Sequence, residues 1–331
     1  MIGRTMSLSP SPEPIPAAAR LFRAASIVLP VALILLLLAC NAIHLRHQSL
    51  RRDFTRAGMR ERTVELESDR LHYWRSTAQG DHPPVLLLHG FGGAAVWQWA
   101  EQVPALAPNR TVLVPDLLWF GGSSSTDADP RLDHQVAAMV ALLDHEGLVE
   151  VDVVGISYGG LVGWRLAQLH GERVRRLVLV DSPGPAHTPD DRAAMLRRFG
   201  VDDVVELIVP QDLAAVRRLL EVAYHDPPAP PDFALRQVKE LLYDPYREPQ
   251  TKLLRALTEG ETLGATIEPV DAAVGLIWGD DDQVFPLEIA LRLSTALAAP
   301  LHVIPHARHA PNLEHPERFN EALLDLLDAP G

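Results

Sequence analysis

The sequence predicts an α/β fold built on a mostly parallel eight-stranded sheet flanked by helices, with an inserted helical cap. Two observations carry this prediction. Short apolar runs alternate along the chain with amphipathic stretches, which is the pattern of a parallel sheet covered by helices. The chain has 331 residues, of which 47% are hydrophobic, so it is long enough to enclose one such core and to carry further segments.

The N-terminal segments are expected to lie outside this core. Residues 1–23 are predicted to form a disordered tail. Residues 24–43 are nearly all apolar and long enough to cross a bilayer, which predicts a single-pass membrane anchor. An alternative is a bacterial lipoprotein signal, because the four residues ending at Cys40 are similar to such a signal and would leave Cys40 lipidated. Residues 44–61 are interpreted as a basic linker.

The charges of the N-terminal part oppose those of the remainder. Residues 1–62 hold nine Arg and three acidic residues, whereas the whole chain has a formal net charge of −13. The arginines after the apolar segment favour a main domain on the cytoplasmic side, but a lipoprotein would lie on the opposite side, so the side of the membrane stays open. An acidic main domain argues against nucleic-acid binding. Cys40 is the only cysteine, which excludes an intramolecular disulfide.

The predicted core comprises residues 62–184 and 268–331, and apolar runs mark its strands. Runs such as Val85 to Leu88 and Val151 to Val154 are continuously apolar, as expected for strands buried on both faces. The eight expected strands lie near residues 62–66, 70–75, 85–88, 111–114, 151–154, 174–180, 274–278 and 301–304.

Between residues 185 and 267 the pattern becomes helical and offers no convincing strand. The expected helices cover Asp191 to Phe199, Asp212 to Ala223 and Phe233 to Tyr243. We interpret this segment as a helical cap that lies over one edge of the sheet and shapes a substrate site.

The pentapeptide Gly155-Ile156-Ser157-Tyr158-Gly159 stands between an expected strand and a helical run. A serine in such a strand-to-helix turn adopts strained backbone angles, so small residues are needed two positions before and after it. The turn would expose the Ser157 hydroxyl and aim the Tyr158 N–H at a developing oxyanion. This setting predicts that Ser157 is a nucleophile.

Three other motifs follow expected strands. His89-Gly90-Phe91-Gly92-Gly93 is a glycine-rich turn, and residues 278–282 read Trp-Gly-Asp-Asp-Asp. The third is His309-Ala310-Pro311. A serine hydroxyl is a weak nucleophile that needs an imidazole base, which in turn needs a carboxylate to fix its tautomer.

With these motifs the chain resembles the α/β-hydrolases, specifically the Ser-His-Asp esterases and lipases that carry a helical cap. The resemblance implies Ser157 as nucleophile, Asp282 as the acid and His309 as the base, in the chain order of this fold. It implies that the backbone N–H groups of Phe91 and Tyr158 form the oxyanion hole. It implies no metal and no cofactor.

Alternatives remain for some of these positions. Asp181 is a second candidate for the acid, because some relatives place the carboxylate at the end of that strand. His89 is interpreted as a structural residue. Trp119 occupies a position where relatives usually have Gly. Trp97, Trp99 and Trp119 either line an apolar acyl site or are ordinary packing residues.

The expected function is that of a membrane-anchored serine hydrolase that cleaves a carboxylic ester, with an apolar acyl group, through an acyl-enzyme intermediate. In similar folds the same triad also serves hydrolysis of amides and carbon–carbon bonds and cofactor-free perhydrolysis, so these remain alternatives. An alternative of another class is a catalytically silent, membrane-tethered binding protein. The expected partners are a small-molecule ester or lipid substrate and a membrane.

Overall fold

The computed structural model describes residues 41–78, 80–127, 130–259 and 267–329. The whole sheet belongs to the compact unit that begins at Ile43. The predicted membrane anchor at 24–43 lies almost wholly outside the described residues. Within the described ranges, no helix combines the length and apolar character that crossing a bilayer requires.

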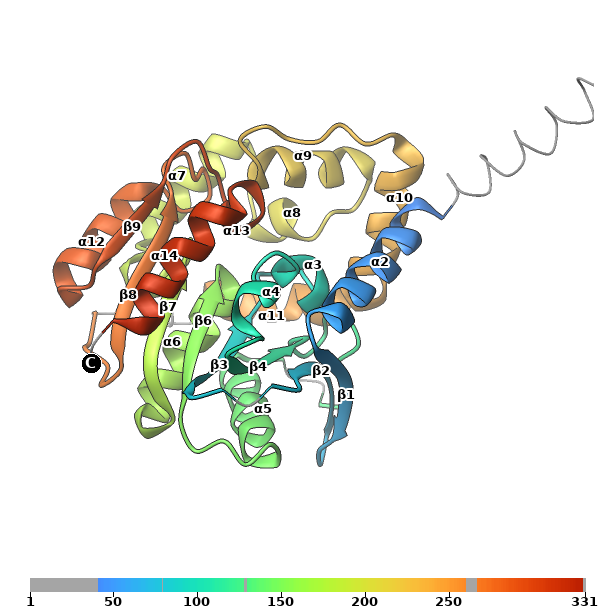
Figure 1. The fold of residues 1–331 in the computed structure, drawn as a ribbon. Helices are drawn as coiled ribbons and strands as arrows, with labels where there is room; N and C mark the ends of the chain where they lie inside the picture. Colours follow the sequence, from blue (N-terminus) through green and yellow to red (C-terminus); the bar gives the residue numbers. More distant parts are fainter. Residues whose placement is uncertain (1–40, 79, 128–129, 260–266, 330–331) are drawn as a thin grey trace, which may run out of the picture. The chain divides into compact units, whose positions relative to one another are not determined.

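A mostly parallel sheet of nine strands forms the centre of the fold, which confirms the predicted α/β class (Figure 1). The strand order is β1-β2-β4-β3-β6-β7-β8-β9, and the two-residue β5 pairs with β2. β2 is antiparallel to β1 and to β4, and every pair from β4 to β9 is parallel. All eight predicted strands are present, and β5 is additional. The bounds are β1 Met59–Glu65, β2 Asp69–Ser76, β3 His82–Leu88, β4 Arg110–Pro115, β5 Ser124–Ser125, β6 Val151–Ile156, β7 Val174–Val180, β8 Ala273–Gly279 and β9 Leu301–Ile304.

Helices cover both faces of this sheet. Successive residues of each central strand point to opposite sides, so each strand contributes apolar side chains to both helical layers. In β7, Leu177 and Leu179 belong to one apolar cluster, whereas Val178 and Val180 belong to the other. The first cluster includes residues of α5 (Leu132–His145), α6 (Tyr158–Leu169) and α12 (Leu287–Leu297). The second includes residues of α3 (Ala95–Trp99), α4 (Val103–Leu106) and α14 (Pro316–Asp328). The short α13 (Pro311–Glu314) precedes α14, and the 3₁₀ turn η1 (Gly171–Arg173) precedes β7.

The segment interpreted as a basic linker, residues 44–61, differs from that expectation. It is occupied mainly by helix α2 (Ala42–Arg56) and the start of β1. Leu50 and Phe54 are one helical turn apart and are both buried in the second apolar cluster. Gly58, with a φ of 86°, makes the turn into β1. The helix therefore packs on the core through two apolar residues placed among many arginines.

Between β7 and β8, the described residues form helices and no strand. After the 3₁₀ turn η2 (Gly184–Ala186) come α7 (Pro189–Phe199), α8 (Val204–Ile208), α9 (Leu213–Ala223), α10 (Asp232–Leu242), the 3₁₀ turn η3 (Asp244–Tyr246) and α11 (Arg247–Glu259). Three of these helices correspond to the expected ones, whereas α8 and α11 were not expected. In α11 the proline at position 249 lies in the first turn, where no intrahelical bond from its nitrogen is needed.

Candidate active site

Ser157 occupies the sharp turn between β6 and α6. Its backbone angles are φ 54° and ψ −119°, a strained conformation for a residue with a side chain. A Cβ atom on Gly155 would lie 2.3 Å from the carbonyl oxygen of Gly159, and one on Gly159 would lie 2.3 Å from that of Leu88. Backbone atoms form both contacts, so neither position has room for a side chain.

His309 connects Ser157 to Asp282 through two hydrogen bonds. The Nε2 atom of His309 lies 3.0 Å from the Ser157 hydroxyl, and its Nδ1 atom lies 2.9 Å from Asp282 Oδ2. The other carboxylate oxygen of Asp282 accepts the N–H groups of Val284 and Phe285 at 2.7 and 3.1 Å. With Nδ1 as donor to Asp282, Nε2 is the acceptor for the serine proton. This arrangement can transfer a proton from the hydroxyl as it attacks a carbonyl carbon.

The other carboxylates near this site are engaged elsewhere. Asp181 is fully buried and accepts the Gly279 N–H at 2.9 Å. Burial, followed by the negative charge of Asp282, raises the pKa of Asp181 well above its usual value. Asp281 pairs with Arg308 at 3.0 Å. Of the two candidate acids, Asp282 is the one that contacts His309.

The predicted oxyanion donors belong to Phe91, in the loop after β3, and to Tyr158, the first residue of α6. Gly90 packs so closely on the turn that a Cβ atom there would lie 3.4 Å from the Ser157 Cβ. The rings of Phe91 and Tyr158 are in edge-to-face contact, with centroids 5.7 Å apart. Among the described residues, no hydrogen bond engages the backbone N–H of either residue. Both groups are therefore available to a ligand oxygen at the N-terminus of α6.

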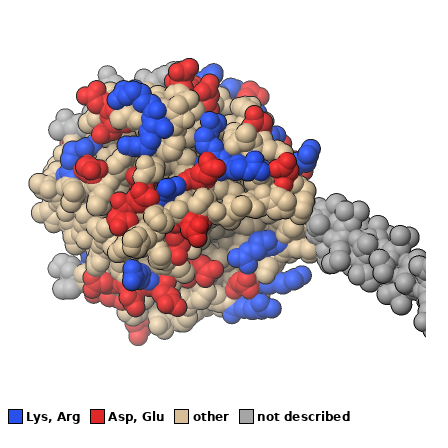
Figure 2. Space-filling model, turned by 90° about the horizontal axis from the view of Figure 1, so that it is seen from above, with Lys and Arg blue, Asp and Glu red and all other residues tan. Residues whose placement is uncertain are grey.

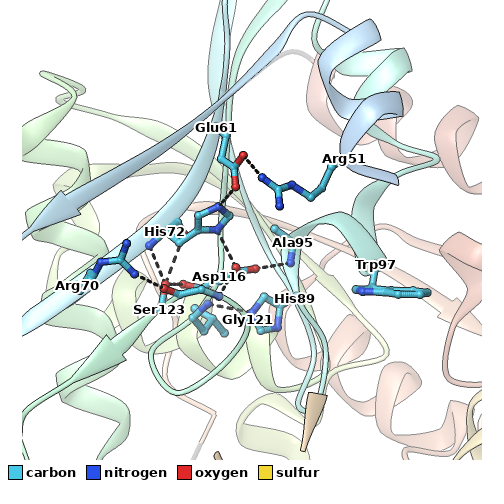
Figure 3. A network of polar contacts seen from close by, with 12 residues as sticks. Arg51, Glu61, Arg70, His72, His89, Ala95, Trp97, Asp116, Gly121 and Ser123 are labelled. Atoms are coloured by element: carbon cyan, nitrogen blue, oxygen red, sulfur yellow. Dashed lines mark hydrogen bonds and ion pairs between the residues drawn. The ribbon is translucent and has the colours of Figure 1, made fainter. Parts of the chain in front are cut away.

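A buried polar network fixes the loop that carries Phe91 (Figure 3). At the start of the loop, His89 Nε2 accepts the Leu117 N–H at 2.9 Å, and at its end Asp116 Oδ1 accepts the Ala95 N–H at 2.7 Å. Burial lowers the pKa of His89, so this residue is a neutral hydrogen-bonding group, as its structural interpretation implies. The loop is thus attached at both ends to the segment after β4.

The same network continues to the surface through His72, which no sequence motif marks. His72 Nδ1 lies 2.8 Å from Asp116 Oδ2, and its Nε2 lies 2.7 Å from Glu61, which also pairs with Arg51 of α2. Burial alone would lower the pKa of His72, but the two carboxylates outweigh burial and raise it. The sequence offers no local signal for this contact, because His72 and Asp116 are 44 positions apart.

A cavity opens next to Ser157 and His309, and both residues contribute to its wall. Half of the lining residues come from the cap, and these include apolar side chains of α7, α8 and α11. These are Met195, Val204, Ile208, Leu254 and Leu257, with Phe285 from the core. The arrangement fits an apolar group attached to a carbonyl carbon at Ser157. In the described part of the chain, no group of three or more His, Cys, Asp or Glu residues is placed to hold a metal ion.

None of the three tryptophans considered for an acyl site lines this cavity, so that suggestion was wrong. Trp99 is fully buried in the core, and Trp97 donates to His47 of α2 at 3.0 Å. Trp119 has a φ of 67°, in the left-handed region that Gly favours, and its ring packs edge-on against His134. Trp119 thus adopts the strained backbone conformation that Gly would adopt freely, and its side chain is buried.

The surface of the compact unit that begins at Ile43 carries charges of both signs (Figure 2). Lys and Arg side chains lie interspersed with Asp and Glu on the face shown, and no large area there is of one sign.

Comparisons with known proteins found matches both in sequence and in structure. A family model described as alpha/beta hydrolase fold matches residues 83–203. The 2-hydroxymuconate semialdehyde hydrolase of Pseudomonas sp. strain CF600 is 31% identical over 263 residues, which cover 74% of this chain and 86% of that protein. Among solved structures, a membrane phospholipase A matches with a TM-score of 0.73 and 23% identity, covering 94% of this chain and 98% of that one. The 2-hydroxy-6-oxo-6-phenylhexa-2,4-dienoate hydrolase of Rhodococcus sp. strain RHA1 matches with a TM-score of 0.68 and 25% identity, covering 82% and 99%.

Proposed function

Since the chain belongs to the α/β-hydrolase fold family, we propose that it is a serine hydrolase that cleaves uncharged carboxylic esters with an apolar acyl group. One observation carries this proposal. The hydrogen-bonded series Ser157, His309 and Asp282 lies at the wall of a largely apolar cavity. Phe91 and Tyr158 line the same cavity, and their backbone N–H groups have no partner among the described residues.

In the proposed reaction, Ser157 Oγ attacks the ester carbonyl while His309 Nε2 takes its proton. The N–H groups of Phe91 and Tyr158 hold the oxyanion of the tetrahedral intermediate. The carbon–oxygen bond to the alcohol then breaks as His309 returns the proton to the leaving oxygen. A water molecule, deprotonated by His309, attacks the acyl-enzyme and releases the acid and free Ser157. Asp282 stabilises the imidazolium in both halves of the reaction without becoming protonated.

A series of p-nitrophenyl esters from acetate to palmitate tests this function with the full-length chain in detergent. We expect hydrolysis by the wild type and a loss of about 10³-fold or more in Ser157→Ala. A fluorophosphonate probe should label the wild type and not the variant. A folded wild-type protein that neither cleaves the esters nor takes the label would contradict ester hydrolysis and favour the silent binding protein.

Hydrolysis of a carbon–carbon bond is the second candidate. The 31%-identical relative is named as a semialdehyde hydrolase, and one cation, Arg192, contributes to the cavity wall here. A guanidinium suits a substrate that carries a carboxylate. The loss of absorbance of 2-hydroxymuconate semialdehyde measures this activity directly. If its kcat/KM exceeded that of every ester, the carbon–carbon reaction would replace ester hydrolysis as the assigned function.

We also propose attachment to a membrane through residues 24–43, on the basis of their apolar sequence. Mass spectrometry of the mature N-terminus in the native host separates the two forms of attachment. An intact N-terminus in the membrane fraction supports the anchor. A chain that begins at a lipidated Cys40 supports the lipoprotein, and a mature chain in the soluble fraction contradicts both.

A further inference from the structure

His187 lies where the chain passes from the sheet into the cap, in the wall of the cavity that also contains Ser157 and His309. It follows η2 and directly precedes Thr188, which caps the N-terminus of α7. The side chain is buried, with 4% of the residue exposed. The proposed ester hydrolysis assigns it no role.

Neither ring nitrogen of His187 has a hydrogen-bond partner among the described residues, and Nε2 is fully buried. Burial of a polar atom without a partner is unfavourable, and such atoms are rare in folded proteins. Two other polar groups of the cavity wall are used within the protein: Arg192 donates to the carbonyl oxygen of Thr258 at 2.7 Å, and the Thr258 hydroxyl donates to the carbonyl oxygen of Leu254. The Tyr158 hydroxyl, beside Gln135 of α5, also has no hydrogen-bond partner among the described residues.

The imidazole is uncharged at neutral pH. Burial lowers the pKa of His187 to about 4, and the charges of Arg192 and Arg292 add to this effect against Asp191. A neutral imidazole carries one N–H donor and one bare nitrogen acceptor. A hydroxyl group is the matching ligand, because its oxygen can accept a hydrogen bond from the N–H and its O–H can donate one to the bare nitrogen.

The position of the ring places such a ligand near the reacting carbonyl. His187 packs edge-on against Phe285 with centroids 5.3 Å apart, and the Phe285 ring lies 5.5 Å from the ring of His309. The Phe285 ring thus contacts both His187 and the proposed base. A substrate held with its carbonyl at Ser157 therefore occupies a cavity whose wall also includes His187.

We propose that His187 is a substrate-binding residue that hydrogen-bonds an uncharged hydroxyl of the ester, in a cavity whose wall is mostly apolar. The preferred substrate is then an ester with a hydroxyl a few atoms from the scissile carbonyl, on the acyl chain or on the alcohol. This inference rests on the proposed ester hydrolysis and names its substrate class.

Two matched pairs of esters test the inference with the full-length enzyme. The acyl pair is p-nitrophenyl butyrate and p-nitrophenyl 3-hydroxybutyrate, and the alcohol pair is propyl butyrate and glyceryl monobutyrate. In at least one pair, we expect the wild type to have a kcat/KM about tenfold or more higher for the hydroxylated member. His187→Phe should remove this preference by lowering kcat/KM for the hydroxylated ester more than kcat/KM for its unsubstituted partner. His187→Gln, which keeps a donor and an acceptor, should retain part of it.

Several outcomes would overturn the inference. A wild type that shows no preference for the hydroxylated ester in either pair would do so. A His187→Phe variant in which kcat/KM falls equally for both members of a pair would also do so. If the wild type cleaved none of the four esters, the proposed function would fail instead. Calorimetric binding of glyceryl monobutyrate and propyl butyrate to Ser157→Ala, with and without His187→Phe, then tests His187 without turnover. Equal binding of the two esters in both backgrounds would overturn the role of His187.

Discussion

The imidazole of His72 and the carboxylate of Asp116 meet at 2.8 Å where the loop carrying Phe91 ends. Asp116 uses its other oxygen for the Ala95 N–H and also accepts the Gly122 N–H at 2.8 Å. Burial would raise the pKa of Asp116, but these hydrogen bonds and His72 lower it. The charged carboxylate therefore connects β2 to the proposed oxyanion loop through hydrogen bonds. The strength of its hydrogen bond to His72 depends on the charge of the imidazole.

We expect His72→Gln to destabilise the protein more at acidic than at alkaline pH. The pKa of His72 is raised above 6.5, so its stabilising contribution is complete below about pH 6.5 and is lost as the pH rises through the folded-state pKa. A hydrogen bond between charged groups contributes about 2 kcal/mol. The free energy of unfolding by urea, measured for both proteins from pH 6 to pH 9, should show a difference of about that size that shrinks with rising pH. A difference independent of pH would mean that His72 is neutral in the folded protein.

Replacing the two neighbouring acids with asparagine should have very different effects on ester hydrolysis. Asp282→Asn should lower kcat about 10³- to 10⁴-fold, because an amide opposite His309 Nδ1 no longer fixes the productive tautomer. Asp181→Asn should lower it less than about tenfold. Burial and Asp282 hold the pKa of Asp181 well above its usual value, so an uncharged amide resembles the native protonated acid. A larger loss in Asp181→Asn than in Asp282→Asn would assign the acid to Asp181.

The sheet could be predicted because buried parallel strands leave continuous apolar runs in the sequence. Helix α2 could not, because only Leu50 and Phe54 reach the core in a segment dominated by arginine. The α8 helix has five residues, too few to show a helical period.

Part of the candidate site could likewise be predicted from the sequence, and part could not. Ser157, Asp282 and His309 each follow a strand in a local motif, and the structure brings the three side chains within hydrogen-bonding distance. His72 and His187 stand in no motif. Their environments arise from segments distant in the chain, so a lone histidine gives no sign of a buried carboxylate or an apolar cavity around it.

The turn at Ser157 predicts that Gly159→Ala is strongly destabilising. Its methyl group would lie 2.3 Å from the Leu88 carbonyl oxygen and 2.6 Å from that of His89, and backbone atoms cannot move aside cheaply. We expect a loss of about 3 kcal/mol or more in the free energy of unfolding, together with loss of fluorophosphonate labelling. The matched control is Gly163→Ala in the same helix. There the new methyl group meets the side chains of Leu177 and Val153 at 3.0 Å, which can shift, so a loss of about 1 kcal/mol or less is expected. Equal effects of the two substitutions would show that the turn tolerates a side chain.

The end of α12 offers a stabilising change far from the proposed site. Ala298 ends this helix with a φ of 49°, in the left-handed region, and is exposed to solvent. That conformation costs an L-residue about 1–2 kcal/mol, whereas glycine adopts it freely and loses part of the gain through the larger entropy of its unfolded chain. Ala298→Gly should therefore raise the free energy of unfolding by about 0.5–1 kcal/mol and leave ester hydrolysis unchanged. Ala296→Gly, also exposed but in the last helical turn, is the control and should lower stability by about 0.5–1 kcal/mol. If both substitutions lowered stability, the left-handed conformation of residue 298 would not be the source of strain at this helix end.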